Sequence, residues 1–132
     1  MSTGPVIAPH ISTELLLEVF DLPVTFYRCL VPITGGVTAA LMLSQAITIT
    51  QEIDAAANGW FSKSKEQWTE DTGLSRWEQA TARRTLRAAG FLEERRIGMP
   101  SRLWYRVCPD RVWHAMKKRA DSRGAHRTQE CS

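Results

Sequence analysis

The chain of 132 residues has few of the features by which metalloproteins and secreted proteins are recognised. Its three cysteines, at positions 29, 108 and 131, share no CxxC spacing. An odd number of scattered cysteines does not form a disulfide framework, so we expect a cytoplasmic protein in a reducing environment. The three histidines have no cysteine at ligand spacing. The sequence therefore predicts no metal site and no cofactor.

Catalytic motifs are also missing. There is no GxSxG, no P-loop, no GxGxxG after a predicted strand and no HExxH. Glu93 and Glu94 fall in a predicted strand, where neighbouring side chains point to opposite faces and cannot share a substrate. Glu70 and Asp71 form an ordinary solvated pair at the end of a predicted helix. We therefore do not expect an enzyme.

Basic residues are nearly absent from the first part of the chain. Residues 1–59 carry one base and five acids, whereas residues 60–132 carry sixteen bases and nine acids. The formal net charge of +3 thus combines an acidic, apolar part with a basic part. This division is typical of a polyanion-binding module joined to a part that packs or pairs. The plainer interpretation of the basic part is a solvated face.

Charge is absent altogether between Leu30 and Gln51, a run long enough to cross a bilayer. The run contains Pro32, a Gly-Gly pair and four threonines, so its hydrophobicity is modest. The first nineteen residues contain no Lys or Arg, which argues against a signal peptide. We expect a buried helix here and no contact with a membrane.

The first part of the chain is divided by prolines and glycines. Residues 1–24 are predicted to form a loose arm and a short apolar segment. The segment Thr25–Thr34 is compatible with a strand or with a short helix. After Gly35 and Gly36, a helix is predicted over Val37–Ile53, with one apolar face made of Val37, Ala40, Leu41, Ser44 and Ile47.

The second part has clearer boundaries. Two capping-box patterns, Ser64 with Gln67 and Ser75 with Glu78, mark the starts of two helices. A polar, disordered tail is predicted over residues 121–132, so that the domain occupies residues 25–120. The predicted elements are, in order, a strand at Gly59–Phe61, helices at Lys65–Asp71 and Arg76–Ala89, strands at Phe91–Ile97 and Arg102–Val107, and a helix at Arg111–Ala120.

This order of elements predicts an α+β, mainly α fold: a winged helix-turn-helix with additional N-terminal and C-terminal helices. In such a fold the second helix of the pair enters the major groove of DNA, where all four base pairs can be distinguished. The first helix holds it at the correct angle, and the hairpin reaches the neighbouring phosphates or the minor groove.

The basic residues lie where this interpretation requires them. With Gln79, Ala82 and Leu86 toward the core, the helix at 76–89 presents most of its arginines outward, and Arg83 lies at the edge of the outer arc. Arginine pairs with guanine in the major groove or with phosphates further along the helix. Trp77 is open to two interpretations, since it could contact DNA or cover a protein partner. The predicted DNA-binding residues are Lys63, Lys65, Ser75, Arg76, Trp77, Ala80, Thr81, Arg84, Arg87, Arg95, Arg96 and Arg102.

The stretch GWFSKSKEQWTEDTGLSRWEQATARRTLRAAGFLEERRIGMPSRLWYRV (residues 59–107) resembles winged-helix domains of phage and plasmid proteins, notably replication initiators and replisome organisers. The preceding PITGGVTAALMLSQAITIT is similar to the helix before the GWF strand in such proteins. The resemblance covers roughly residues 26–116. It implies that Ser75, Arg76, Trp77, Ala80, Thr81 and Arg84 lie on the DNA-facing helix and that Arg95, Arg96 and Arg102 lie on the wing.

The functional expectation is a small plasmid or phage protein that binds double-stranded DNA. It would act as a transcriptional regulator or as a replication accessory factor, because the usual companion domain of an initiator is missing. We expect a homodimer on a two-fold site, with a replication or host protein as a further partner. The alternative is a protein-interaction module that inhibits or recruits another protein through the same fold.

Overall fold

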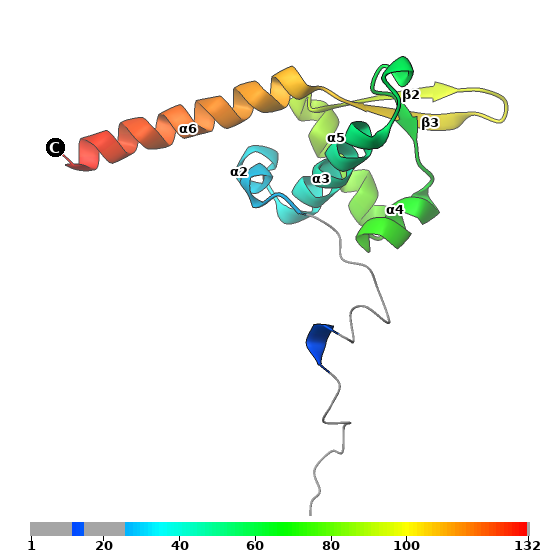
Figure 1. Ribbon diagram of the computed structural model, residues 1–132, viewed down its shortest axis with the longest axis horizontal. Helices are drawn as coiled ribbons and strands as arrows, with labels where there is room; N and C mark the ends of the chain where they lie inside the picture. Colours follow the sequence, from blue (N-terminus) through cyan, green and yellow to red (C-terminus); the bar gives the residue numbers. More distant parts are fainter. Residues whose placement is uncertain (1–11, 15–25, 132) are drawn as a thin grey trace, which may run out of the picture.

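The computed structural model describes residues 12–14 and 26–131 (Figure 1). This part is α+β and mainly helical, with one small antiparallel sheet, an architecture compatible with the predicted fold. The predicted arm and apolar segment at residues 1–24 lie outside the described residues, apart from 12–14. The elements are η1 (Arg28–Leu30), α2 (Val31–Thr34), α3 (Val37–Glu52), η2 (Ala55–Ala57), β1 (Phe61–Ser62), α4 (Lys65–Thr72), α5 (Arg76–Ala89), β2 (Leu92–Ile97), β3 (Arg102–Val107) and α6 (Pro109–Cys131).

The sheet has the strand order β1-β3-β2, so the last strand in the chain is the central one. β2 and β3 form the predicted hairpin, in which Arg95 pairs with Trp104 and Glu94 with Tyr105. β1 adds to the other edge of β3, where Phe61 pairs with Tyr105. Strand side chains alternate between the two faces of a sheet. Tyr105 is therefore buried against the helices, and Trp104 faces the other side.

The two central helices begin where the sequence predicts; α5 also ends as predicted, and α4 ends one residue later, at Thr72. Ser64 and Ser75 each accept a hydrogen bond from the backbone of the third helical residue, and both capping boxes are complete. Gly73 ends α4 and Gly90 ends α5, both with the positive φ that glycine adopts without strain. The turn between α4 and α5 is consequently short and well defined.

The core surrounds α3, which packs against α5 and the sheet. The predicted apolar face of this helix is partly wrong, because Val37 is 59% exposed. The fully buried positions are Ala39, Ala40, Met42, Leu43, Ser44 and Ala46. A helix covered on several sides buries more than one stripe, which the spacing of its apolar residues alone does not reveal.

Two further segments refine the sequence-based expectations. The segment Thr25–Thr34 is helical, as η1 and α2, and Pro32 occupies the first turn of α2, where its missing N–H is not needed. The last helix continues through the predicted tail to Cys131. Only Gly124 interrupts an otherwise helix-compatible composition there, and no proline follows Pro109. Figure 1 shows α6 passing above α2 and extending away from the body. Within residues 12–14 and 26–131, no helix combines the length and the apolar character that crossing a bilayer requires.

Candidate nucleic-acid interface

Helix α5 is fixed to α4 by one buried amide. The side chain of Gln79 is 2% exposed, and its Nε2 donates to the Lys65 carbonyl at 3.1 Å and to the Leu74 carbonyl at 3.0 Å. The Thr69 hydroxyl lies 3.0 Å from the same nitrogen. A buried amide destabilises the folded protein unless its hydrogen bonds are made. These hydrogen bonds therefore hold the two helices at one angle.

On its other flank α5 is joined to the hairpin by an ion pair. Arg83 donates from Nε and Nη2 to the two carboxylate oxygens of Glu94, at 2.7 Å and 2.8 Å. The Glu94 side chain is 7% exposed and that of Arg83 is 16% exposed. These hydrogen bonds raise the pKa of the Arg83 guanidinium. Arg87 Nη1 lies 3.6 Å from the same carboxylate, so two arginines of α5 converge on β2.

The outer face of α5 is open to solvent, as predicted. Trp77 is 75% exposed, and Arg76, Ala80, Arg84 and Arg87 are exposed as well. Arg76 Nη2 lies 2.7 Å from Glu66 Oε1, but both side chains are about two-thirds exposed, so water screens this pair. The pKa of Glu66 is lowered, first by a hydrogen bond from its own backbone amide and then by the Arg76 charge.

Two of the predicted DNA-binding residues, one in α5 and one at its N-cap, are less available to DNA than predicted. Thr81 is only half-exposed, although the helical spacing places it on the outer arc. Ser75 uses its hydroxyl to accept the Glu78 amide at 3.1 Å, so it starts the helix instead of offering a free donor.

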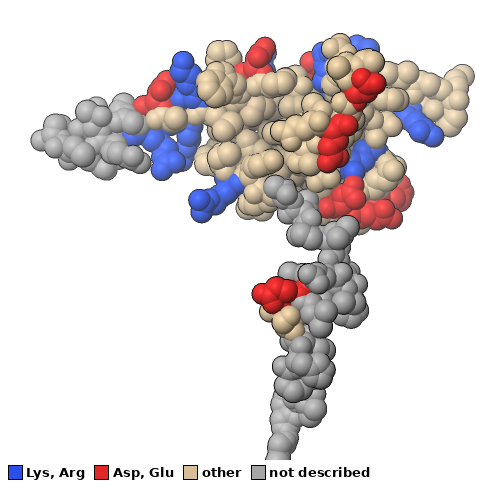
Figure 2. Space-filling view, in the orientation of Figure 1, with Lys and Arg blue, Asp and Glu red and all other residues tan. Residues whose placement is uncertain are grey.

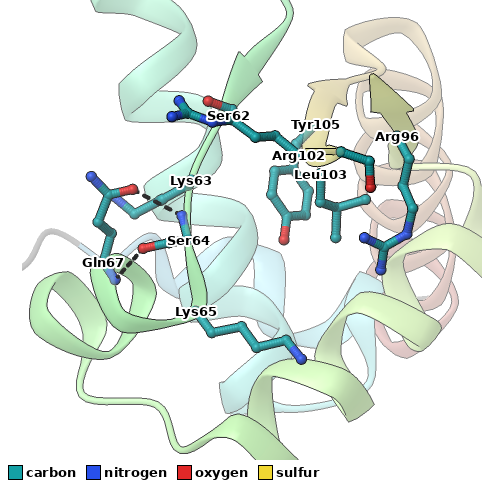
Figure 3. Close-up of a pocket in the computed structure, with 10 residues that line it drawn as sticks. Ser62, Lys63, Ser64, Lys65, Gln67, Arg96, Arg102, Leu103 and Tyr105 are labelled. Atoms are coloured by element: carbon teal, nitrogen blue, oxygen red, sulfur yellow. Dashed lines mark hydrogen bonds between the residues drawn. The ribbon is translucent and has the colours of Figure 1, made fainter. Parts of the chain in front are cut away.

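A cleft of about 530 Å³ opens between the start of α4 and the hairpin (Figure 3). Lys65 of α4 and Arg96 of β2 extend into it from opposite sides. None of the residues that line it is acidic, and the N-terminal end of α4 adds partial positive charge. The cleft therefore suits an anion. Its lining consists of Ser62, Lys63, Ser64, Lys65, Gln67, Arg96, Ser101, Arg102, Leu103 and Tyr105.

Lys63 lines this cleft but its charge is already neutralised. Its Nζ forms an ion pair with Asp71, and it lies 5.3 Å from the ring centroid of Trp68. The Lys63 side chain is only 10% exposed. The predicted role of Lys63 as a free phosphate-binding cation is therefore not supported, whereas Lys65 remains exposed at the cleft.

The three predicted wing arginines do not act as one group. Arg96 and Arg102 both line the cleft, but they leave the hairpin on opposite faces. Because neighbouring strand residues alternate, Arg96 lies on the face of Leu103, whereas Arg102 and Arg95 lie on the other face. There the guanidinium of Arg95 lies 4.9 Å from the ring centroid of Trp60, and that of Arg106 lies 4.8 Å from it. Arg95 therefore stacks on an aromatic ring on the face away from α5.

Glu93 belongs to this outer face as well. It accepts a hydrogen bond from Arg106 at 3.0 Å and another from the Cys108 thiol at 3.3 Å. These two donors, the thiol first, lower the pKa of Glu93. Burial raises the pKa of Cys108. Glu93 and Glu94 thus lie on opposite faces with different partners, as the strand pattern predicts, and they do not form a shared acidic site.

Sequence analysis missed the polar groups that complete the cleft. Ser62, Gln67 and Ser101 line it beside the cations. No motif marks Ser62 or Ser101, and the capping box marks Gln67 only as a helix start. The role of Gln79 was easier to predict, because an amide side chain on the buried face of a helix requires hydrogen-bond partners.

Acidic side chains lie along one side of the surface formed by the outer face of α5 and the cleft. Figure 2 shows them gathered over α4, whose exposed acidic residues are Glu66, Glu70 and Asp71. An extended polyanion can therefore approach α5 and the cleft from the hairpin side, but it is repelled from the outer surface of α4.

Comparison of the chain with protein-family models, with curated proteins and with solved structures found no significant match. Within the described ranges, no group of three or more His, Cys, Asp or Glu side chains has a geometry suited to a metal ion.

Proposed function

We propose that this protein binds double-stranded DNA as a winged helix, with α5 as the recognition helix and the β2–β3 hairpin as the wing. The observation that carries the proposal is the basic lining of the cleft between the start of α4 and the hairpin. Lys65 and Arg96 enter it from two different elements, and no acidic residue lines it. Duplex DNA is a polyanion with regularly spaced phosphates, which basic groups on neighbouring elements can bind together.

Under this proposal the contacts divide into two kinds. Arg76, Trp77 and Ala80 in the first turns of α5 reach base edges, where a guanidinium can bind guanine with two hydrogen bonds. Arg84 and Arg87, further along the helix, bind phosphates together with the cleft residues Lys65, Arg96 and Arg102. Phosphate contacts set the register, and the base contacts select the sequence.

The fixed geometry around α5 supports this function. Gln79 holds α5 against α4, and the Arg83–Glu94 pair holds it against the hairpin. A recognition helix and a wing must keep their spacing if they are to contact one duplex simultaneously. The biological role that we propose is a plasmid or phage protein of the cytoplasm, acting as a transcriptional regulator or a replication accessory factor.

The test is binding of the purified chain to the DNA upstream of its own gene and to random duplex, at two salt concentrations. We expect affinity to fall linearly with the logarithm of salt concentration, and the double variant Lys65→Ala/Arg96→Ala to lower the slope by about 2. Arg28→Ala/Arg111→Ala removes the same charge from exposed positions outside the proposed interface and serves as the matched control. No binding to either duplex would contradict the proposal.

One observation favours a second function. Trp77 is 75% exposed on α5, an unusual position for so large an apolar ring, and such rings often anchor protein interfaces. In this alternative the same face of α5 binds an acidic protein. Tight association with a protein partner in the absence of DNA, abolished by Trp77→Ala, would favour it over the DNA-binding proposal.

A further inference from the structure

An apolar groove lies between α3 and the first half of α6, away from the cleft and from the outer face of α5. Its volume is about 340 Å³, and its apolar wall is made by Ile47, Val107, Val112 and Met116. Trp113 stands at the groove and is 63% exposed. A tryptophan beside an apolar groove exposes hydrophobic surface that a folded protein normally covers.

Charges of opposite sign flank this groove. At the end where α3 stops and α6 starts, Glu52, Asp54 and Asp110 are exposed. Further along α6, Lys117, Lys118 and Arg119 are exposed, where Figure 2 shows basic side chains on the extended part of the helix. Among the described residues, none of these six side chains forms a salt bridge.

We infer that this face binds a second copy of the chain, with the two α6 helices antiparallel and Trp113 and Met116 at the centre. A two-fold axis through an apolar centre brings the acidic end of each copy against the basic half of the other. The surface is therefore complementary to itself. Its apolar centre supplies the buried area, and the charges on either side define the antiparallel orientation.

The extension of α6 from the body is consistent with binding of a second copy of the chain. The helix continues to Cys131, well past the last residues that pack on the body, and residues 117–123 are all exposed. An isolated helix end gains little stability by itself in water. Packing against the same helix of a second copy would cover it and stabilise it.

The test is sedimentation equilibrium of the full chain without DNA, over about a hundredfold range of protein concentration. We expect a monomer–dimer equilibrium whose Kd rises about tenfold or more in Trp113→Glu, because a hot-spot aromatic residue is replaced by a charge. Met99→Glu makes the same kind of change at the hairpin tip, where Met99 is 99% exposed, and we expect it to leave Kd unchanged.

A charge exchange separates this interface from general hydrophobic association. Lys117→Glu/Lys118→Glu should weaken the dimer, and adding Glu52→Lys/Asp110→Lys to the same chain should restore it. Circular dichroism checks that each variant is folded. A monomer at every concentration, or a dimer insensitive to Trp113→Glu and to the charge exchange, would overturn the inference. Either result leaves the DNA-binding proposal untouched, because no DNA is present.

Discussion

Helices α5 and α6 are both basic, but the structure holds them in opposite ways. α5 is capped at both ends, packs on α3 and is joined to α4 by Gln79 and to the hairpin by Arg83. α6 packs on the body through residues such as Val112 and Met116 in its first half and then extends from it (Figure 1). Basic character alone therefore does not define what a helix does in this molecule.

The two helices differ in how firmly the rest of the structure holds them in position. A helix that reads a DNA groove must keep its position relative to the wing, and α5 has fixed contacts on three sides. A helix that joins two copies of a chain needs mainly an accessible surface, which α6 provides. Variants that exchange or remove these properties test the comparison directly.

The largest expected difference lies in the packing of the two helices. Leu86 of α5 is fully buried, whereas Trp113 of α6 is 63% exposed. Leu86→Ala should lower the free energy of unfolding by about 2–5 kcal/mol, because it leaves a cavity in the core. Trp113→Ala should change it by less than about 1 kcal/mol in the monomer. Urea denaturation at low protein concentration measures both, and similar losses would show that α6 is also part of the core.

A smaller difference is expected for the charged residues that anchor α5. Glu94→Ala leaves Arg83 largely buried without its carboxylate, and we expect a loss of about 3 kcal/mol. Asp110→Ala removes an exposed carboxylate from α6 and should cost about 0.5 kcal/mol. The double variant Arg83→Met/Glu94→Leu should recover most of the lost stability but not the DNA affinity. Full recovery of affinity would show that the ion pair does not position α5.

The smallest effects on stability are expected at exposed basic residues. Arg84→Ala on α5 and Lys118→Ala on α6 should each change the free energy of unfolding by no more than about 0.5 kcal/mol. Only Arg84→Ala should lower the slope of DNA affinity against salt, by about 1. Titrations of a labelled duplex at several salt concentrations separate the two variants, and equal slopes would place α6 on the DNA as well.

The second part of the chain was predictable because its signals are local. Serine capping boxes, glycines with positive φ and the alternation of strand residues each act within a few positions. The face of α3 was less predictable, because its burial depends on elements far away in the sequence. Val37 fits the apolar spacing but lies at the exposed start of the helix.

The candidate interface shows the same limit for charges. The sequence identifies every basic residue but not which of them has a partner. Lys63 pairs with Asp71 and Arg83 with Glu94, across separations that only the tertiary fold brings together. Arg95 differs from Arg96 by one position, yet the pleat of the strand places them on opposite faces. Predicting a basic wing was possible, whereas assigning its arginines required the structure.

The hairpin is held on both faces near its base, by Glu94 on the inner face and by the stacking of Arg95 and Arg106 on Trp60 on the outer face. We therefore expect bending to be concentrated beyond these contacts, around the turn at residues 98–101. On DNA, such a tip could follow local variations in groove width while the base keeps a constant distance from α5. Adaptation to the shape of the duplex and recognition of its bases would then be carried out by separate parts of the same element.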